Sequence, residues 1–213
     1  MRQTYDETEA LKTRIVEVSR EVFAEKGYAA AKMSDIAERA NVSRGPLYYH
    51  FQNKQVLFEY VCSQINLTME REIKEMFSRT DLSLSEKLYH DLMISNKYVD
   101  VVYAQEMAFL TNENEFKDLR HSFVDELERL GEFKEAELDK AYNEGLLKSP
   151  EAAGQIVQIL ITSYGMLIRR GPNNIKHKYN TMDVESLAEF VVEGIQHQFF
   201  VTPDQSKSAG KSE

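Results

Sequence analysis

Residues 43–51 read SRGPLYYHF and gather side chains that suit contact with a charged polymer. Arg44 carries a planar fork of N–H donors that matches the edge of a guanine base or a phosphate group. Tyr48, Tyr49 and His50 add hydroxyl and ring N–H donors for phosphates, and ring faces for the methyl group of thymine. The alternative interpretation packs both tyrosine rings into a core, but adjacent residues of one helix cannot both face inward. The stretch therefore indicates a nucleic-acid-binding surface.

A short helix is expected to present these side chains. Ser43 stands where it can cap the helix start, and Pro46 falls in the first turn, where backbone N–H groups have no partner within the helix. Gly45 lets the helix start approach a partner closely. Another short helix is expected over residues 34–40, and Asn41 follows it where the chain can turn through a left-handed conformation. This order predicts a helix-turn-helix.

Apolar residues are spaced to bury this helix pair against a preceding helix. Leu11, Ile15, Val18 and Val22 recur at spacings of three and four, which predicts a first helix that ends at Gly27. The apolar residues expected to form a small core within the pair are Ile36, Ala37, Ala40, Val42, Leu47 and Phe51.

The rest of the chain also predicts helices. The sequence contains 4 Pro, 9 Gly and no Trp, and residues of high helix propensity are abundant. Asn53 is expected to cap a long helix, while the join near Asn96 stays open. Apolar helical stretches cover 57–76, 88–109, 119–145, 151–168 and 184–199. Residues 171–182 predict a loop and residues 203–213 a disordered tail, so we expect an all-α fold.

Charge is divided unevenly along the chain. The formal net charge is -9 over 213 residues. Residues 1–54 contain nine basic and eight acidic side chains, whereas the remainder contains 17 basic and 27 acidic ones. The acidity belongs to the C-terminal part, so the net charge does not exclude nucleic-acid binding by the first part.

Several other classes of protein are not expected. The acidic start lacks the apolar run of a signal peptide, and residues 156–168 fall short of the ~20 apolar residues of a membrane span. We therefore expect a soluble cytoplasmic protein. A lone Cys62 allows neither an intrachain disulfide nor a multi-cysteine zinc site. The Glu–His pairs at i and i+4 are interpreted as surface pairs, so neither a metal nor a cofactor is expected.

The stretch SDIAERANVSRGPLYYHFQNKQVLF resembles the DNA-binding signature of the tetracycline-repressor (TetR) family of bacterial regulators. The resemblance covers roughly residues 8–61. It implies an N-terminal three-helix DNA-binding domain over residues 1–52 and a larger helical domain over residues 53–202 that dimerises and binds a small molecule. The sequence departs from the family pattern at Asn41, where glycine is usual, and at Lys32, where a threonine cap is frequent.

The resemblance also implies roles for single residues. By this resemblance, the residues that face base edges in the major groove are Arg44, Gly45, Pro46 and Tyr49. Those implied to engage phosphates are Ser34, Ser43, Tyr48, His50 and Lys54.

Aromatic residues and methionines of the C-terminal part either line a ligand cavity or form plain core. The candidates for the cavity are Met93, Tyr103, Met107, Phe123, Leu127 and Tyr164. Acidic neighbours such as Asp91, Asp100 and Glu106 fit a cationic lipophilic ligand, although a solvated face would look the same. The last two helices resemble the family's dimerising four-helix bundle, with a central core as the alternative.

The leading hypothesis is a homodimeric, sequence-specific DNA-binding repressor that a small molecule releases from a palindromic operator. One rival is a helical enzyme, but no phosphate-binding glycine loop, nucleophile elbow or paired metal-ligand motif is present, so no enzyme is expected. A second rival is a helical partner-binding protein without DNA-binding activity. The sequence leaves open the operator, the effector, the regulated genes, the number of dimers per operator, and whether the ligand releases or promotes binding.

Overall fold

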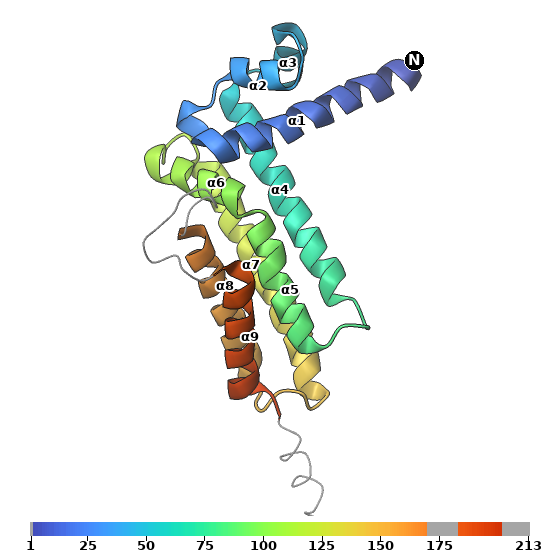
Figure 1. Ribbon diagram of the computed structural model, residues 1–213, viewed down its shortest axis with the longest axis vertical. Helices are drawn as coiled ribbons and strands as arrows, with labels where there is room; N and C mark the ends of the chain where they lie inside the picture. Colours follow the sequence, from blue (N-terminus) through green and yellow to red (C-terminus); the bar gives the residue numbers. More distant parts are fainter. Residues whose placement is uncertain (1, 170–182, 202–213) are drawn as a thin grey trace, which may run out of the picture. The chain divides into compact units, whose positions relative to one another are not determined.

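The computed structural model describes residues 2–169 and 183–201, with side chains over 7–165 and 183–201, and its fold is all-α (Figure 1). The described helices are α1 (Arg2–Ala30), α2 (Met33–Arg39), α3 (Arg44–His50), α4 (Lys54–Phe77), α5 (Leu84–Lys97), α6 (Val99–Thr111), α7 (Lys117–Asn143), α8 (Ala152–Arg169) and α9 (Val184–Phe199). The expected loop at 171–182 and tail at 203–213 lie outside the described residues. The prediction of an all-α fold that begins with a helix-turn-helix is confirmed.

The helices pack into two compact units that interleave along the chain. The first unit takes its described residues from 1–68, 98–124 and 168–175, and the second from 69–97, 125–167 and 176–213. Helices α4, α7 and α8 therefore contribute residues to both units. The expected border between residues 52 and 53 falls inside the first unit, because α6 packs against α1 there. The functional division of the chain at that border stays a prediction.

Local chemistry sets the helix borders in the first unit. Gly27 has φ 70° and ψ 167°, a combination essentially restricted to glycine, so α1 is broken there before a last turn that reaches Ala30. Asn41 has φ 53° in the turn between α2 and α3, as the sequence predicts. The Asn53 side-chain oxygen accepts a hydrogen bond from the Val56 backbone N–H at 2.9 Å and caps α4, also as predicted.

Two expected details of the helix starts are wrong. Helix α2 begins at Met33, one residue earlier than expected, because the Asp35 backbone N–H already bonds the Lys32 carbonyl at 3.0 Å. Ser43 occupies the N-cap position of α3, but its side chain makes no capping hydrogen bond. The turn and the backbone geometry therefore start α3 without help from the serine hydroxyl.

The first unit is built on a small aliphatic core and an aromatic cluster. Within the helix pair, the predicted core residues Ile36, Ala37, Ala40, Leu47 and Phe51 are buried, and Val42 is half-buried. Phe23 of α1 and Phe58 of α4 are 0% exposed, with ring centroids 4.9 Å apart in an edge-on arrangement. The Phe58 ring also lies 5.4 Å from that of Phe116. These rings join α1, α4 and the residues that precede α7.

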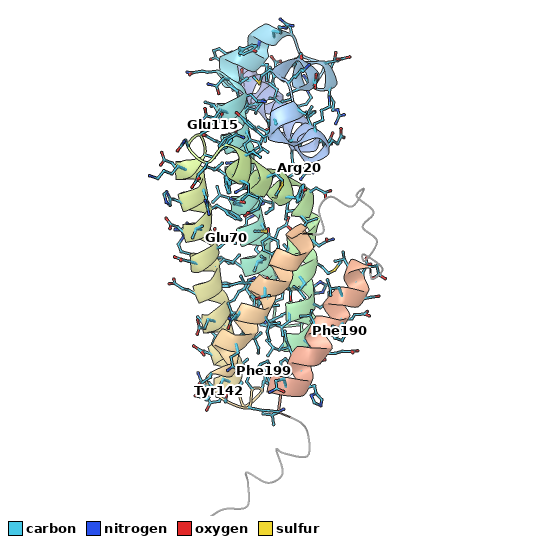
Figure 2. All side chains as sticks on the ribbon, turned by 90° about the vertical axis from the view of Figure 1, so that its left-hand side faces the viewer. Arg20, Glu70, Glu115, Tyr142, Phe190 and Phe199 are labelled. Atoms are coloured by element: carbon cyan, nitrogen blue, oxygen red, sulfur yellow. The ribbon has the colours of Figure 1, made fainter. Side chains whose placement is uncertain are left out.

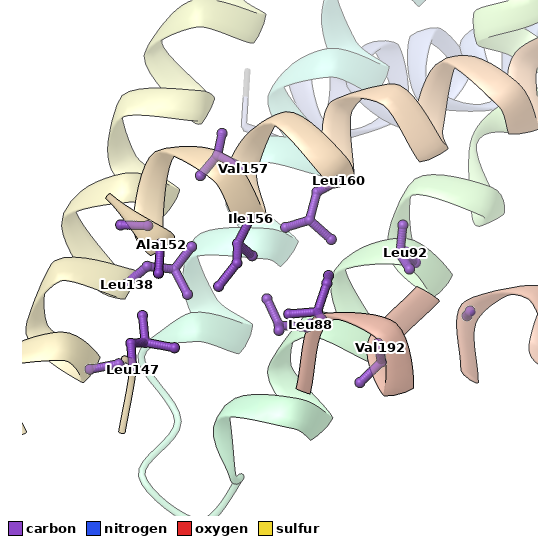
Figure 3. Close-up of a cluster of buried hydrophobic side chains, with 13 residues drawn as sticks. Leu88, Leu92, Leu138, Leu147, Ala152, Ile156, Val157, Leu160 and Val192 are labelled. Atoms are coloured by element: carbon purple, nitrogen blue, oxygen red, sulfur yellow. The ribbon is translucent and has the colours of Figure 1, made fainter. Parts of the chain in front are cut away.

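The second unit has its own apolar core, drawn from four helices (Figure 3). Leu88 of α5, Leu138 of α7 and Ile156 of α8 are each 0% exposed, and Ile195 of α9 is 1% exposed. The buried residues of α8 recur at spacings of three and four and so lie along one side of the helix, whereas Ile161 on another side is 49% exposed. None of the described helices has the length and apolar character that a membrane span needs.

A charged pair lies inside the second unit. Asp91 of α5 is 1% exposed and Lys134 of α7 is 6% exposed. The Lys134 ammonium nitrogen lies 2.8 Å from each oxygen of the Asp91 carboxylate. Removing two such charges from water is costly, so each partner is tolerated only while the other remains.

We therefore predict opposite outcomes for breaking the pair and for replacing it. Lys134→Met leaves the Asp91 carboxylate buried and unpaired, which should lower the free energy of unfolding by about 3–5 kcal/mol. The double variant Asp91→Leu/Lys134→Met should lie within about 1 kcal/mol of the wild type or above it. Denaturant unfolding at neutral pH measures both, with Lys140→Met, on the exposed side of α7, as the control. A double variant as unstable as the single one would contradict this account.

Candidate nucleic-acid interface

Helix α3 exposes the residues that the sequence singles out. Tyr49 is 80% exposed, Tyr48 is 47% exposed, and Arg44 is exposed as well. On the opposite side of the helix Leu47 is 0% exposed, and Phe51, just beyond the helix, is 2% exposed. The buried side of the helix thus fixes which residues point outward, and the prediction that at least one tyrosine is exposed is confirmed.

The expected DNA-binding set also includes residues of α2, of α3 and of their caps. These residues lie on or near the same face. Ser34, Ser43 and Gly45 are exposed, whereas Pro46 and His50 are half-buried. An added Cβ at Gly45 would meet no other atom within 4 Å, so the space beside it is open. The face therefore combines exposed donors with an unobstructed stretch of backbone.

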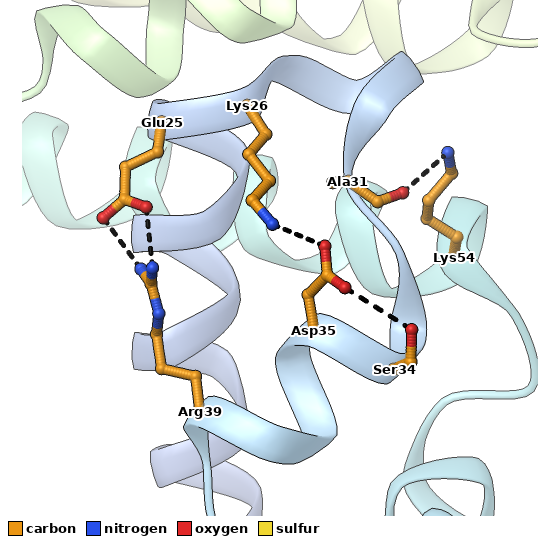
Figure 4. A network of polar contacts seen from close by, with 7 residues as sticks. All are labelled: Glu25, Lys26, Ala31, Ser34, Asp35, Arg39 and Lys54. Atoms are coloured by element: carbon orange, nitrogen blue, oxygen red, sulfur yellow. Dashed lines mark hydrogen bonds and ion pairs between the residues drawn. The ribbon is translucent and has the colours of Figure 1, made fainter.

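Ion pairs hold α2 against α1 (Figure 4). Lys26 bonds the Asp35 carboxylate at 2.6 Å, and Arg39 donates to both carboxylate oxygens of Glu25 at 2.8 and 2.7 Å. The Arg39 hydrogen bond lowers the pKa of Glu25, and the Lys26 hydrogen bond lowers the pKa of Asp35. Two of the basic residues counted in the first part of the chain are therefore engaged within the protein.

Lys54 is also engaged within the protein. Its ammonium group donates to the backbone carbonyls of Tyr28 at 2.8 Å, Ala29 at 3.3 Å and Ala31 at 3.2 Å. Sequence reasoning missed this arrangement, because the acceptors are backbone groups more than 20 residues away. The expected contact of Lys54 with phosphate stays a prediction, and it would have to compete with these three hydrogen bonds.

Sequence reasoning also missed Tyr28. Its hydroxyl donates to the Glu115 carboxylate at 2.6 Å, and its ring centroid lies 4.8 Å from that of Phe116. Burial, followed by the hydrogen bond to Glu115, raises the pKa of Tyr28, so the hydroxyl remains a donor. We call Tyr28, Lys54, Glu115 and Phe116 the Tyr28 junction; Figure 2 labels Glu115 in its place before α7.

Two basic residues remain available on the α2–α3 side. Arg44 and Lys32 are exposed, and neither forms an ion pair within the described part of the chain. Sequence reasoning treated Lys32 only as a departure from the family's usual cap. Its exposure at the start of α2 makes it a further candidate for a phosphate contact.

The residues expected to line an effector cavity are distributed over both units. Tyr103, Met107 and Phe123 belong to the first unit, and Met93, Leu127 and Tyr164 to the second. Phe123 and Tyr164 are buried and the other four are half-buried. Their role as a ligand site stays a prediction.

Each unit contains a hollow in its surface or core. The hollow in the first unit has a volume of about 290 Å³ and is lined by residues of α1 and α4 and by Tyr98. The hollow in the second unit has a volume of about 10 Å³ and is lined by residues of α5, α8 and α9. The smaller hollow has room for about one water molecule at most. Neither is lined by the residues expected for the effector cavity.

Comparison with known proteins places the interface in a family context. Residues 15–61 match the family model described as "Bacterial regulatory proteins, tetR family". The chain is 31% identical over 114 residues to the "Probable acrEF/envCD operon repressor" of Escherichia coli K12, which covers 52% of each protein. It is 34% identical over 68 residues to "HTH-type transcriptional regulator TtgR" of Pseudomonas putida, covering 32% of each. The chain spans about half the length of the curated relatives it matches, or less.

Solved structures share the fold along most of the chain. A transcriptional regulator from Aquifex aeolicus VF5 superposes with a TM-score of 0.66 at 24% identity, covering 88% of this chain and 98% of that one. Salmonella enterica GusR superposes with a TM-score of 0.62 at 18% identity, covering 88% and 96%. At these identities the likeness concerns the fold alone.

The lowered pKa of Glu25 leads to a prediction on acid stability. Because its pKa is below the unfolded value of about 4.3, Glu25 contributes stability at neutral pH and loses that contribution as the pH falls through the folded value. Glu25→Gln should therefore lower the melting temperature at pH 7 by roughly a few degrees at most, since the pair is exposed, and the gap should close in acid, once the pH has fallen below the folded pKa of Glu25. Melting curves followed by circular dichroism test this, with Glu38→Gln on the exposed side of α2 as the control. A gap of equal size at both pH values would argue against the ion pair as its cause.

Proposed function

This chain belongs to the TetR family of bacterial regulatory proteins, and from that premise we propose that it is a homodimeric, sequence-specific DNA-binding regulator that represses transcription in the cytoplasm. The observation that carries the proposal is the exposure of Tyr48, Tyr49 and Arg44 on one short helix whose other side is buried. The relatives named above are called repressors or regulators rather than enzymes, in agreement with the expectation that the chain is not an enzyme.

Helix α3 would enter the major groove of the operator. Arg44, Gly45, Pro46 and Tyr49 would face base edges, and Arg44 has the fork geometry that pairs with guanine. Ser34, Ser43, Tyr48 and His50 would bond phosphates and fix the position of the helix on the duplex. This assignment is supported by the open space beside Gly45 and by the absence of an acidic partner for Arg44 in the described part of the chain.

The acidic overall charge is compatible with this proposal. DNA affinity depends on the basic groups that neutralise phosphates, rather than on the sum of all charges. Residues 1–54 are nearly neutral, and the surplus of acidic residues follows residue 54. A regulator with this distribution would approach DNA through its first 52 residues, and residues 53–202 would serve effector binding and dimerisation.

The last two helices would form the dimer. Phe190 of α9, which Figure 2 labels, is 67% exposed. Ile161 of α8 is 49% exposed, so both large apolar side chains are in contact with water. A second copy of the same helix pair would cover both residues in a four-helix bundle. Two copies of α3 would then read two half-sites of a palindrome, about 34–36 Å or a multiple of that distance apart.

A small molecule would release the repressor from its operator. Helix α4 starts at Lys54, next to the helix-turn-helix, and ends at Phe77 in the second unit. A ligand that favours one arrangement of the helices around α4 would change the separation of the two copies of α3, and a modest change is enough to lose two-site binding. Met93, Tyr103, Met107, Phe123, Leu127 and Tyr164 stay the proposed contacts of this effector.

Selection of bound duplexes from random DNA tests the central proposal, and we expect a palindromic operator. On that operator, Arg44→Ala should cost about 1–3 kcal/mol and relax the preference at one base position of each half-site. The control is Arg79→Ala, because Arg79 belongs to the second unit and pairs with Asp81. Failure to enrich any duplex at low ionic strength would favour the partner-binding alternative, and an equal loss on every sequence would remove Arg44 from base readout. Repeating the selection with candidate small molecules tests release.

A second prediction concerns the dimer. Phe190→Glu would place a carboxylate in the proposed four-helix bundle, which should raise the dimer dissociation constant by more than about tenfold. Sedimentation at several protein concentrations measures this constant. Leu67→Glu is the matched control, since Leu67 is 53% exposed but lies on α4. An unchanged constant for Phe190→Glu would exclude this face of α9 from the dimer interface.

A further inference from the structure

The Lys54 ammonium group has all of its donors satisfied by one short segment of backbone. An ammonium group offers three N–H donors and no acceptor. The three donors meet three carbonyls, those of Tyr28, Ala29 and Ala31, at 2.8, 3.3 and 3.2 Å. Figure 4 shows the bond to Ala31 beside the ion pairs that join α1 and α2.

These carbonyls need a donor because of the break in α1. The last carbonyls of a helix have no intrahelical N–H partner, and Gly27, with its φ of 70°, ends the regular part of α1 just before this segment. A positive charge at the carbonyl end of a helix is also favoured by the helix dipole. Lys54 therefore satisfies the backbone that connects α1 to α2.

The Tyr28 ring fixes the other side of the same arrangement. The Lys54 nitrogen lies 4.4 Å from the centroid of the Tyr28 ring, a cation–π contact. The Tyr28 hydroxyl is held by Glu115 at 2.6 Å, and the ring packs edge-on against Phe116. The acceptors and the ring that surround Lys54 are thus themselves held in place, so the ammonium group occupies a formed site.

We propose that Lys54 is a positioning residue for the helix-turn-helix rather than a phosphate contact: it fixes the α1–α2 connection that carries α2 and α3. The inference rests on the proposed DNA-binding function. To reach a phosphate, the ammonium group would have to leave three carbonyls at a helix end, and these would lose their donor. Lys54 consequently contributes to operator affinity without releasing a counterion from DNA.

Salt dependence separates the two roles. The slope of log K against log salt falls by about 0.9 for each phosphate contact that is lost. For Lys54→Met in the full-length chain, we expect an unchanged slope together with an operator affinity that is on the order of tenfold weaker. Lys32→Met is the matched control, and its slope should fall by about 0.9, because its exposed ammonium group is the candidate for a phosphate contact at the start of α2.

Hydrogen exchange provides a second measurement, which does not involve DNA and accompanies the salt-dependence experiment. The Ala31 backbone N–H bonds the Gly27 carbonyl at 3.2 Å within the α1–α2 connection. Lys54→Met should accelerate hydrogen exchange of this amide several-fold, whereas Arg44→Met should leave it unchanged. Should Lys54→Met fail to fold, Lys54→Gln, which keeps a neutral donor, replaces it, and its slope should also equal that of the wild type.

The outcomes are distinct. A slope that falls by about 0.9 in Lys54→Met or Lys54→Gln would show a phosphate contact and overturn the inference. An unchanged slope with unchanged operator affinity and unchanged Ala31 exchange would overturn it as well, because no positioning effect would exist. A wild-type chain that binds no duplex at any salt concentration would instead refute the proposed function itself.

Discussion

The outward face of α3 depends on the burial of a single side chain on its inner face. Leu47 is fully buried, and in a helix of seven residues this burial leaves little rotational freedom. Because successive residues of a helix are rotated by about 100°, fixing Leu47 inside forces Tyr48 and Tyr49 toward solvent. Phe51 reinforces the constraint just beyond the helix. The same apolar packing that stabilises the helix pair thus presents the residues proposed to bind DNA.

Five basic residues of the helix-turn-helix and its supports divide into two groups by their contacts. Lys26 and Arg39 bond carboxylates between α1 and α2, and Lys54 bonds backbone carbonyls. These charges position the helix-turn-helix and are already compensated. Arg44 and Lys32 form no ion pair in the described part of the chain and remain available to an external anion. A count of basic residues therefore overstates the electrostatic attraction to DNA, since residues of the first group are already engaged within the protein.

The sequence predicts those features of the fold that depend on neighbouring residues. Asn41 at the left-handed turn and Asn53 at the start of α4 could be identified because their side chains or backbone act within a few positions. Helical periodicity predicted that at least one of the two adjacent tyrosines is exposed. The hydrogen bond of Tyr28 to Glu115 could not be predicted, because it joins residues 87 positions apart. The resemblance assigned Lys54 to a phosphate, and its backbone acceptors carry no sequence signal.

The Tyr28 junction limits how the first unit can change shape. The hydrogen bond between Tyr28 and Glu115 ties the end of α1 to the segment between α6 and α7. Phe116 packs against the same ring, and the Gln55 side chain bonds the Glu115 carbonyl at 3.3 Å. A displacement of this segment must therefore break these contacts or move the Tyr28 ring. Because Lys54 lies over that ring, any such movement would also displace the backbone between α1 and α2, to which the helix-turn-helix is attached.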